Sequence, residues 1–469
     1  MSSSTLREDE LDKSIEDNKD LNASRQRPNP TLHRTESNFD RALDAEANID
    51  ESPTEGDPVP ISEKNDNDPG PPPNGGLTAW LQVLGSFFLF FNAWGLVNTF
   101  GVYQTYYATN PVWHASPSDI SWIGSIQAFL LLLVGVISGP AYDNGYFRAL
   151  IATGATLIPF GFMMTSLCKT YWQTMLAQGI CIGVGAGCIF IPSVAILPQY
   201  FSTRKALANG MAASGSSLGG VLYPIIFIRL QPHIGFAWAT RVLGFISLVT
   251  VWFSVLVMRP RVMPKHKRHL VDLTAFTELP YVLFCIAMFV AFIGFYGPVY
   301  YDQSYGIQQG ITSERLGFYL LPMLNAASIP GRLVPNFLAD HIGPLNVMGP
   351  CCFMTGMLAL IWIGIHNVGG LIAFSCLYGF FSGGLVSIPP VAIVYLTKDM
   401  TKIGTRMGQL FFISAFGLLT GTPVTGAILG TSYDWLGVQL FSGIAVVLAA
   451  LLVFWARFSI TGLRLRGKT

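Results

Sequence analysis

The sequence predicts an all-α membrane protein with twelve transmembrane helices in two six-helix halves and both termini in the cytosol. The first observation is composition: the 469 residues are 51% hydrophobic and only 12% charged, about half the charged fraction of a soluble domain. The second is that apolar segments of about 20 residues, the length of a helix that crosses a bilayer, recur after the first 76 residues. The third is an internal repeat that relates one half of these segments to the other.

Residues 1–76 are predicted to form a disordered acidic tail in the cytosol. They hold 18 of the 27 acidic and 8 of the 28 basic side chains, and they contain too few large apolar groups to offset the entropy lost on ordering. Met1 is not followed by the apolar stretch and cleavage site of a signal peptide. The Pro- and Gly-rich run 68–76 is expected to be the linker that leads into the membrane.

Twelve apolar segments follow the tail, and each is predicted to be a membrane-spanning helix. They are 79–103, 119–140, 147–168, 172–197, 206–230, 236–258, 279–302, 314–338, 345–365, 370–396, 404–430 and 434–457. Only Lys169, Thr170 and Tyr171 separate the third segment from the fourth, which predicts a short, tight loop there.

The distribution of Lys and Arg predicts that both termini are cytosolic, because basic residues resist translocation. With the tail inside, fifteen basic residues fall on the cytosolic side and four on the outer side, and Arg332 remains within the eighth segment. The cytosolic group comprises Arg148, Arg204, Lys205, Arg259, Arg261, Lys265, Lys267, Arg268, Lys398, Lys402, Arg406, Arg457, Arg464, Arg466 and Lys468.

The chain contains a repeat with an offset of 197 residues. The motif PSVAI at 192–196 reappears as PPVAI at 389–393, and the same offset relates Asp143 to Asp340. Transporters are commonly built from duplicated halves. We therefore expect four parts: the tail 1–76, an N-terminal half over 77–258, a cytosolic linker over 259–278, and a C-terminal half over 279–469 that ends in a short basic tail.

Four local motifs narrow the class of transporter. They are NGGLTAW at 74–80, SPSDISWIGSIQAF at 116–129, YFSTRKALANGMAASGSSLGG at 200–220 and PNFLADHIGPLNV at 335–347. Together they resemble the monocarboxylate-porter family of the major facilitator superfamily (MFS), in its fungal branch, over 74–460. The resemblance implies the MFS fold and alternating access, in which the two halves rock about a central cavity that opens to each side in turn.

The resemblance also implies where an anionic substrate would bind. In the family an arginine of the eighth span contacts the substrate, and it corresponds to Arg332. Animal monocarboxylate carriers add a lysine in the first span and an aspartate in the eighth, whereas Asn98 and Ser328 stand at those places here. The difference favours a larger organic or amphipathic metabolite, for example an exported secondary metabolite, over lactate.

Two other functions remain open from the sequence. One is a proton-linked importer of short monocarboxylates, and the other is a membrane sensor that binds its ligand without transporting it. No cofactor is expected; an ion gradient, with the proton as first candidate, would drive transport. The expected location is the plasma membrane.

Arg332 is the charge that the apolar pattern explains least. It lies between Pro330 and Pro335, eight residues before Asp340, so about 12 Å of helix separates it from the cytosolic loop. A charge at that depth costs roughly 2.5 kcal/mol or more and normally faces a cavity or a partner. We therefore predict that Arg332 contacts the substrate; the alternative is that it snorkels to the inner surface or pairs with Asp340.

Further polar side chains within the spans are candidates for substrate contacts in a mostly apolar pocket. Each could equally form a hydrogen bond between helices. The candidates are Asn98, Gln127, Tyr296, Asn325, Ser328 and Tyr378.

Small residues recur at every fourth position in two spans. Gly179, Gly183 and Gly187 share one helix face, as do Gly379 and Gly383. Such a face lets helices approach closely, and we expect it on surfaces that slide during rocking.

Four charged residues at cytosolic helix ends are predicted to form a gating network, namely Asp143, Arg148, Arg204 and Asp340. Carboxylates there would cap helix N-termini and pair with basic residues in one conformation only, although a purely topological role for the basic members is the alternative. Asp302 is the nearest candidate for a proton carrier, but its place at the predicted outer end of the seventh span favours a surface-facing helix end.

A transporter is expected rather than an enzyme, because no nucleophile–base arrangement is recognisable. The seven cysteines lack the spacing of a metal site or a disulfide framework. The basic segment 259–269 fits membrane topology and anionic lipid better than nucleic acid. The expected partners are therefore a small-molecule substrate and the bilayer; the sequence does not determine the oligomeric state, and a monomer can be functional.

Overall fold

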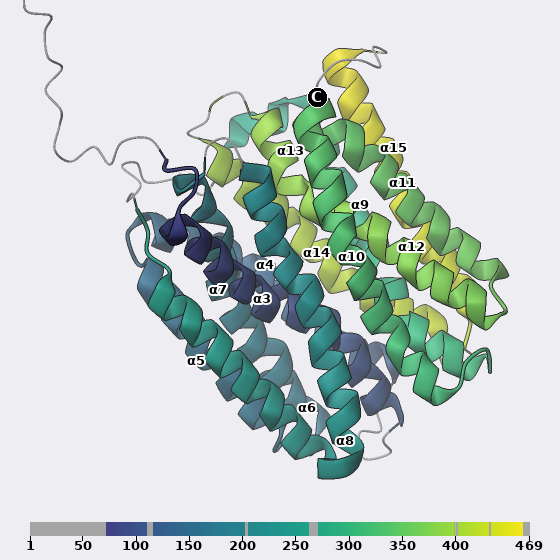
Figure 1. Cartoon of the computed structure of the whole chain (residues 1–469). Helices are drawn as coiled ribbons and strands as arrows, with labels where there is room; N and C mark the ends of the chain where they lie inside the picture. The colour runs from purple at the N-terminus through teal and green to yellow at the C-terminus, as the bar shows by residue number, and fades with distance from the viewer. Residues whose placement is uncertain are drawn as a thin grey trace, which may run out of the picture. The chain divides into compact units, whose positions relative to one another are not determined.

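The computed structural model describes residues 72–109, 116–201, 205–261, 271–397, 399, 402–430 and 433–462. The chain divides into two units, Met1–Asp68 and Pro69–Thr469, and all described residues belong to the second. The predicted disordered tail up to residue 71 lies outside the described residues. All regular secondary structure in the described ranges is helical (Figure 1).

The helices follow the predicted spans closely. Their bounds are α3 Leu77–Thr109, α4 Pro117–Asp143, α5 Phe147–Thr165, α6 Tyr171–Thr174, a π-helical η1 Met175–Ile182, α7 Gly183–Ala195, α8 Lys205–Val257, α9 Leu279–Gln308, α10 Glu314–Ile342, α11 Pro344–Ile361, α12 Val368–Ser387, α13 Pro389–Leu396, α14 Ile403–Leu429 and α15 Trp435–Thr461. Short 3₁₀ turns are η2 Leu197–Gln199, η3 Leu273–Thr277 and η4 Trp362–Gly364. The tight loop after α5 is confirmed.

Two sequence signals set the breaks between helices. α8 changes direction at Gly235, whose φ of 74° is outside the helical region and suits a residue without Cβ. Pro389 and Pro390 begin α13 directly after α12, because proline cannot continue the hydrogen-bond ladder of the preceding turn. Gly235 falls in the gap between the predicted fifth and sixth spans.

The helices form a multi-pass membrane bundle. Ten of those described are long and apolar enough to cross a bilayer. α10 is not among them, because Arg332 and other polar residues lower its hydropathy, and the ten count α8 once despite its break. The count of twelve spans and the cytosolic termini therefore stay predictions.

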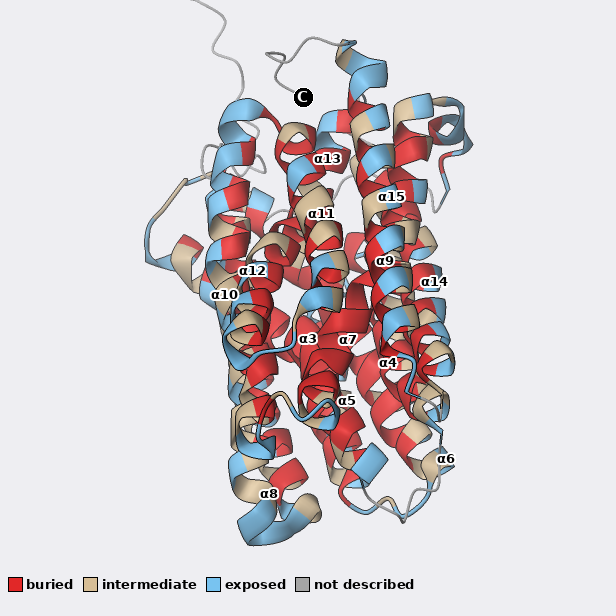
Figure 2. Cartoon of the chain, turned by 90° about the vertical axis from the view of Figure 1, so that its right-hand side faces the viewer, coloured by how far each residue is buried: buried red, intermediate tan, exposed pale blue. Residues whose placement is uncertain are grey.

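Apolar side chains cover the outside of the bundle as well as its core. Large ones such as Leu256, Phe337 and Trp455 are exposed, while the most deeply buried residues lie along the inner helix faces (Figure 2). Helices that are apolar on both faces suit a lipid environment.

The helices pack into two groups that meet along two seams. α3 and α5 pack against α8, whereas α9 packs against α14 and α15, and α10 against α12. The seams between the groups are α4 with α14 and α8 with α10. We call the end of the bundle where α3 begins and α10 ends the proximal end, and the opposite end the distal end; the proximal end is the one predicted to be cytosolic.

The two glycine stripes allow close helix contacts, as predicted. A Cβ on Gly183 would lie 3.0 Å from the carbonyl oxygen of Gln127 on α4, and one on Gly379 would overlap that of Leu324 on α10. Each pair of helices belongs to one group, so these contacts do not lie at the seams, and sliding of the two faces stays a prediction. The glycines hold each half together.

Candidate functional site

A cavity lies between the two helix groups, in the proximal half of the bundle. Its lining comes from α3, α4, α7 and α8 on one side and α9, α10, α12, α13 and α14 on the other. The lining residues are Phe90, Trp94, Leu132, Phe190, Val194, Asn209, Ala213, Met288, Phe292, Arg332, Val386, Ser387, Pro389, Pro390, Leu410, Phe411 and Ser414. Arg332 is the one charged residue in this lining.

Aromatic rings form one wall of the cavity. The Phe190 ring on α7 lies edge-on to Phe90 and Trp94 of α3, with centroids 6.2 and 5.7 Å apart. It also meets Phe411 of α14 at 5.4 Å, so the wall crosses from one group to the other. Such a surface suits a flat or amphipathic organic ligand.

Arg332 projects into this cavity from α10 and is 6% exposed. Its Nη1 donates to the Ala213 carbonyl of α8 at 3.5 Å, at the limit of a hydrogen bond. Within the described ranges its Nε has no partner and no carboxylate pairs with it. Asp340 is exposed, so the buried guanidinium neither snorkels to the proximal surface nor forms an ion pair with that residue.

Asn98 and Tyr296 meet beyond Arg332, on the distal side of the cavity. The Tyr296 hydroxyl on α9 donates to Asn98 Oδ1 on α3 at 3.4 Å, and it lies within electrostatic range of Arg332. Both are buried. The structure thus brings three of the predicted binding residues from three helices toward one region, although only Arg332 is in the lining itself.

Ser328 and Asn325 lie on α10, in its seam with α8. The hydroxyls of Ser328 and Ser217 share a hydrogen bond of 2.7 Å. Asn325 donates to the carbonyl of Leu321 and fills the space over Gly220, where a Cβ would lie 2.5 Å from its Oδ1. In this arrangement both residues close the seam.

Gln127 lies apart from the other candidates, whereas Tyr378 lies near Tyr296. The Tyr378 hydroxyl on α12 donates to the carbonyl of Phe295 at 2.7 Å, which is a contact within one helix group. Gln127 is buried on α4 beside Gly183 of α7. Neither belongs to the cavity lining.

The predicted gating residues lie at the proximal end. Asp143 is the last residue of α4 and is buried, whereas Arg148 and Asp340 are exposed. No ion pair involves Arg148 or Asp340 in the part of the chain that the structure describes. Arg204 lies outside the described residues, so the gating network stays a prediction.

Three polar lining residues were not predicted: Asn209, Ser387 and Ser414. Ser387 accepts from Asn336 Nδ2 at 2.7 Å and donates to the Gly383 carbonyl. One sequence signal could have located this wall: both copies of the repeated motif contribute to the lining, through Val194 in the first and Pro389 and Pro390 in the second. The described residues hold no group of three His, Cys, Asp or Glu side chains that could bind a metal.

A charge cluster with a buried Arg406 and Asp272 at its centre joins the linker to α14 at the proximal end. Arg406 is 4% exposed and donates to Asp272 Oδ2 at 3.1 Å and to both Glu278 oxygens at 3.0 and 2.6 Å. Lys402 lies 3.3 Å from Asp272 Oδ1. Hydrogen bonds from Thr274, Arg406 and Lys402 lower the pKa of Asp272 to about 2, so the cluster holds a stable anion.

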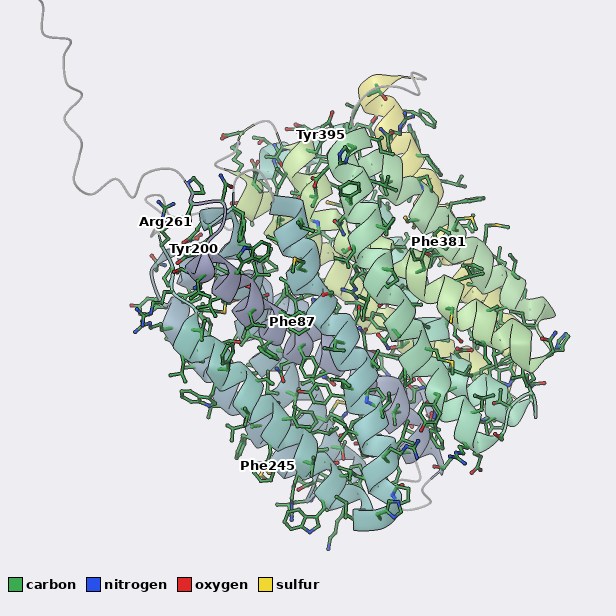
Figure 3. All side chains as sticks on the ribbon, viewed as in Figure 1. Phe87, Tyr200, Phe245, Arg261, Phe381 and Tyr395 are labelled. Carbon is green, nitrogen blue, oxygen red and sulfur yellow. The ribbon has the colours of Figure 1, made fainter. Side chains whose placement is uncertain are left out.

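The other end of the linker is bound to the N-terminal group. The Tyr200 hydroxyl donates to the Arg259 carbonyl at 2.7 Å, and the amides of Arg259 and Arg261 donate to Gln82 and Gln199. Tyr200 and Arg261 lie together at this end of the bundle (Figure 3). Each end of the linker is thus anchored to its own group of helices.

The expectation that Asp302 is a surface-facing helix end is wrong. α9 continues past the predicted end of the span to Gln308, which leaves Asp302 1% exposed. Its Oδ2 accepts a hydrogen bond from Ser375 of α12 at 2.6 Å.

Comparisons with known proteins agree with this architecture. The profile of the Major Facilitator Superfamily matches residues 80–363. The chain is 49% identical over 382 residues to the MFS-type transporter dbaD of Emericella nidulans, which covers 81% of this chain and 86% of that protein. It is 40% identical over 388 residues to the aspyridones efflux protein apdF of the same fungus, covering 82% and 79%.

A third relative extends the match over nearly the whole of its own length. The MFS transporter asaE of Aspergillus flavus is 35% identical over 440 residues, which is 91% of this chain and 99% of that protein. Two of these relatives are described as MFS transporters and one as an efflux protein. The chain belongs to the major facilitator superfamily and is a multi-pass membrane transporter.

Proposed function

We propose that the protein exports an anionic, amphipathic secondary metabolite across the plasma membrane by alternating access, driven by an ion gradient. A proton gradient is the simplest driving force for this chemistry. The monocarboxylate-porter branch is proposed as its place within the superfamily. The substrate is a small molecule that reaches the site from the proximal, cytosolic side.

The observation that carries the proposal is that the buried guanidinium of Arg332 has no anionic partner among the described side chains. A guanidinium remains charged when buried, and this one has a single weak backbone contact and no carboxylate partner among the described side chains. A substrate carboxylate or enolate in the cavity would supply the missing acceptors. A bidentate pair of this kind is both strong and directional.

The rest of the cavity supports a larger substrate than lactate. The lining is mostly aromatic and aliphatic, with Asn209, Ser387 and Ser414 as its neutral polar groups. An amphipathic ligand can place its anionic group at Arg332 and its apolar body on the aromatic wall. Asn98 and Ser328 keep the region beyond Arg332 free of further charge.

The relatives support the direction of transport. One of them is described as an efflux protein for aspyridones, and it aligns over most of this chain. Export of a related class of compound fits a cavity in the proximal half of the bundle, where a cytosolic substrate would enter.

The test is transport by the purified full chain in liposomes with an imposed pH gradient. A panel of acids from lactate and pyruvate to larger aromatic, tetramic-acid and polyketide-like compounds would be presented on the proximal side. We expect movement of the larger acids and none of lactate. Gradient-driven uptake of lactate alone would instead identify an importer of short monocarboxylates and contradict the proposal.

Arg332→Gln tests the anion contact directly. Loss of a buried charge pair costs about 3 kcal/mol, so the apparent affinity for the transported acid should fall by roughly 100-fold. Arg315→Gln is the matched control, because Arg315 is exposed on the same helix. Wild-type affinity in Arg332→Gln, with expression equal to that of the control, would show that Arg332 is structural.

A further inference from the structure

A buried carboxyl group in the C-terminal group of helices takes no part in the cavity. Asp302 is 1% exposed, and it lies on α9 short of the helix end at Gln308. Charged side chains within membrane helices are costly, and they commonly mark ion or proton pathways. The question is whether the surroundings of Asp302 suit a proton.

The hydrogen bonds around Asp302 can accommodate both protonation states. Ser375 Oγ lies 2.6 Å from Asp302 Oδ2 and 2.9 Å from the carbonyl of Leu371, but its hydroxyl has one hydrogen. When the carboxylate is ionised, Ser375 donates to it. When the carboxyl is protonated, it donates to Ser375 Oγ, and Ser375 turns its hydrogen to Leu371. A proton can therefore bind or leave without breaking the packing.

Among the described residues, no cation competes with the proton for this carboxylate. No described Lys, Arg or His forms an ion pair with Asp302, and its Oδ1 has no hydrogen-bond partner in the same ranges. The titratable groups that interact with it are the phenols of Tyr305 and Tyr378, and their hydroxyls donate to the carbonyls of Ile365 and Phe295.

Charged groups at the distal ends of the neighbouring elements are directed to the surface. The exposed ones are Asp119 of α4, Glu314 and Arg315 of α10, His366 between η4 and α12, and Asp434 before α15. The distal part of α14 that packs against α9 carries no titratable side chain, and the α3 tyrosines 103, 106 and 107 pack with Phe236 of α8. The carboxyl is therefore isolated from other charges.

A polar group lies between the carboxyl and the distal surface. Thr312 sits beside Gly306, one helical turn beyond Asp302, where a Cβ would lie 3.0 Å from its Oγ1. The Thr312 hydroxyl is buried and makes no hydrogen bond to the described residues. Because position 306 carries no side chain, this hydroxyl is a candidate relay for a proton that comes from the distal side.

The same turn of α9 faces the other helix group. The hydroxyls of Tyr301 and Ser121 of α4 share a hydrogen bond of 2.6 Å, and Ser304 lies 3.4 Å from Thr105 of α3. Residues 301 and 304 therefore close the distal seam, while 302 and 305 point into their own group. Asp302 therefore lies in the segment of α9 whose neighbouring residues close the distal seam.

We propose that Asp302 is the proton-binding site of this transporter. The carboxylate takes up a proton from the distal side, which removes a buried charge and favours the closed distal seam. With the distal seam closed, the proton leaves toward the proximal side, and the returning charge favours reopening of the distal seam. Coupling of this proton to export rests on the proposed function; proton binding itself does not.

Infrared difference spectroscopy of the full chain in lipid nanodiscs, titrated with pH, tests the proton site without any substrate. We expect the carbonyl stretch of a neutral carboxylic acid at neutral pH in the wild type and in Glu314→Gln, an exposed control on α10. This band should be lost in Asp302→Asn. It should shift in Ser375→Ala, which keeps the carboxyl but removes its hydrogen-bond partner, and which serves if Asp302→Asn does not fold.

The spectroscopic and transport results separate the two claims. The assignment of Asp302 as the proton site is overturned if the wild type lacks the carboxylic-acid band. It is also overturned if the band survives in Asp302→Asn, or if its position does not change in Ser375→Ala. If the acid panel reveals a transported compound, Asp302→Asn should transport it at a rate that no longer depends on the pH gradient. If the rate in Asp302→Asn depends on the gradient as strongly as in Glu314→Gln, proton coupling through Asp302 is contradicted. If no acid is transported, the proposed export fails while the spectra still decide Asp302.

Discussion

Asp272 is the residue whose titration the structure defines most directly. It lies in the linker before η3, and hydrogen bonds from Thr274, Arg406 and Lys402 hold its pKa at about 2. A carboxyl whose pKa is lowered on folding stabilises the fold above its unfolded pKa, and this contribution is lost as the pH falls through the folded pKa. The contribution of Asp272 should therefore be complete at neutral pH and fade between about pH 4 and pH 2.

Asp272→Asn makes this prediction measurable. The apparent melting temperature of the variant in detergent should lie below that of the wild type at pH 7, because Arg406 then keeps only Glu278 as a charged partner. The gap should narrow as the pH is lowered through about 4. A gap that is constant over this range would show that the packing of Asp272, and not its charge, matters.

Single residues differ in how far the sequence revealed them. Arg332 was recognisable because a charge in an apolar run has few explanations, and its burial at the cavity agrees with the predicted depth. Asp302 was misplaced because hydropathy marks where apolar character ends and not where the helix ends, and α9 continues for more than a turn. Asp272 and Arg406 meet across 134 residues of chain, a separation that no local pattern reports.

At the scale of helices, close contacts through glycine determine how α10 and α12 pack. A Cβ at Gly379 would overlap the Leu324 carbonyl oxygen of α10, and backbone atoms cannot rotate away as a side chain can. Gly379→Ala should therefore force the two helices apart and destabilise the protein by about 1–3 kcal/mol. The measurement is the thermal midpoint of the purified protein in detergent.

The control for this prediction is Gly408→Ala on α14. A Cβ there would lie 3.5 Å from Val136 of α4, which is ordinary contact, so we expect a neutral or slightly stabilising effect. A thermal midpoint in Gly379→Ala as high as that of the wild type would mean that the helix contact at Gly379 has room to relax. The four-residue spacing predicted close packing, but it could not predict the partner helix, because that depends on the tertiary arrangement.

For the linker too, the sequence predicted a property of composition but not the contacts with distant residues. Its basic composition predicted a cytosolic connection between two halves. The contacts that fix its two ends are visible only in the structure: Tyr200 and Gln82 bind one end, and Arg406 binds the other. Both anchors are at the proximal end, and each binds the linker to its own group of helices.

For the whole molecule, the hydrogen bonds between the helix groups indicate which end is closed. At the distal end Ser121 bonds Tyr301, Ser118 donates to the Pro423 carbonyl, and the Ser125 and Thr422 hydroxyls are in contact. The cavity with Arg332 lies in the proximal half. Alternating access requires these distal bonds to break when the substrate leaves, so their strength sets the balance between the two arrangements.

Tyr301→Phe tests this balance. It removes the hydroxyl that bonds Ser121 but keeps the ring, and a net loss of about 1 kcal/mol shifts the equilibrium between closed and open distal ends by roughly fivefold. Hydrogen–deuterium exchange should become faster in the distal segments of α4 and α9. Tyr281→Phe is the control, because the Tyr281 hydroxyl on the same helix bonds the Arg406 carbonyl within one group. It should lower stability without opening the distal seam; faster distal exchange in both variants, or in neither, would contradict a gate at Tyr301.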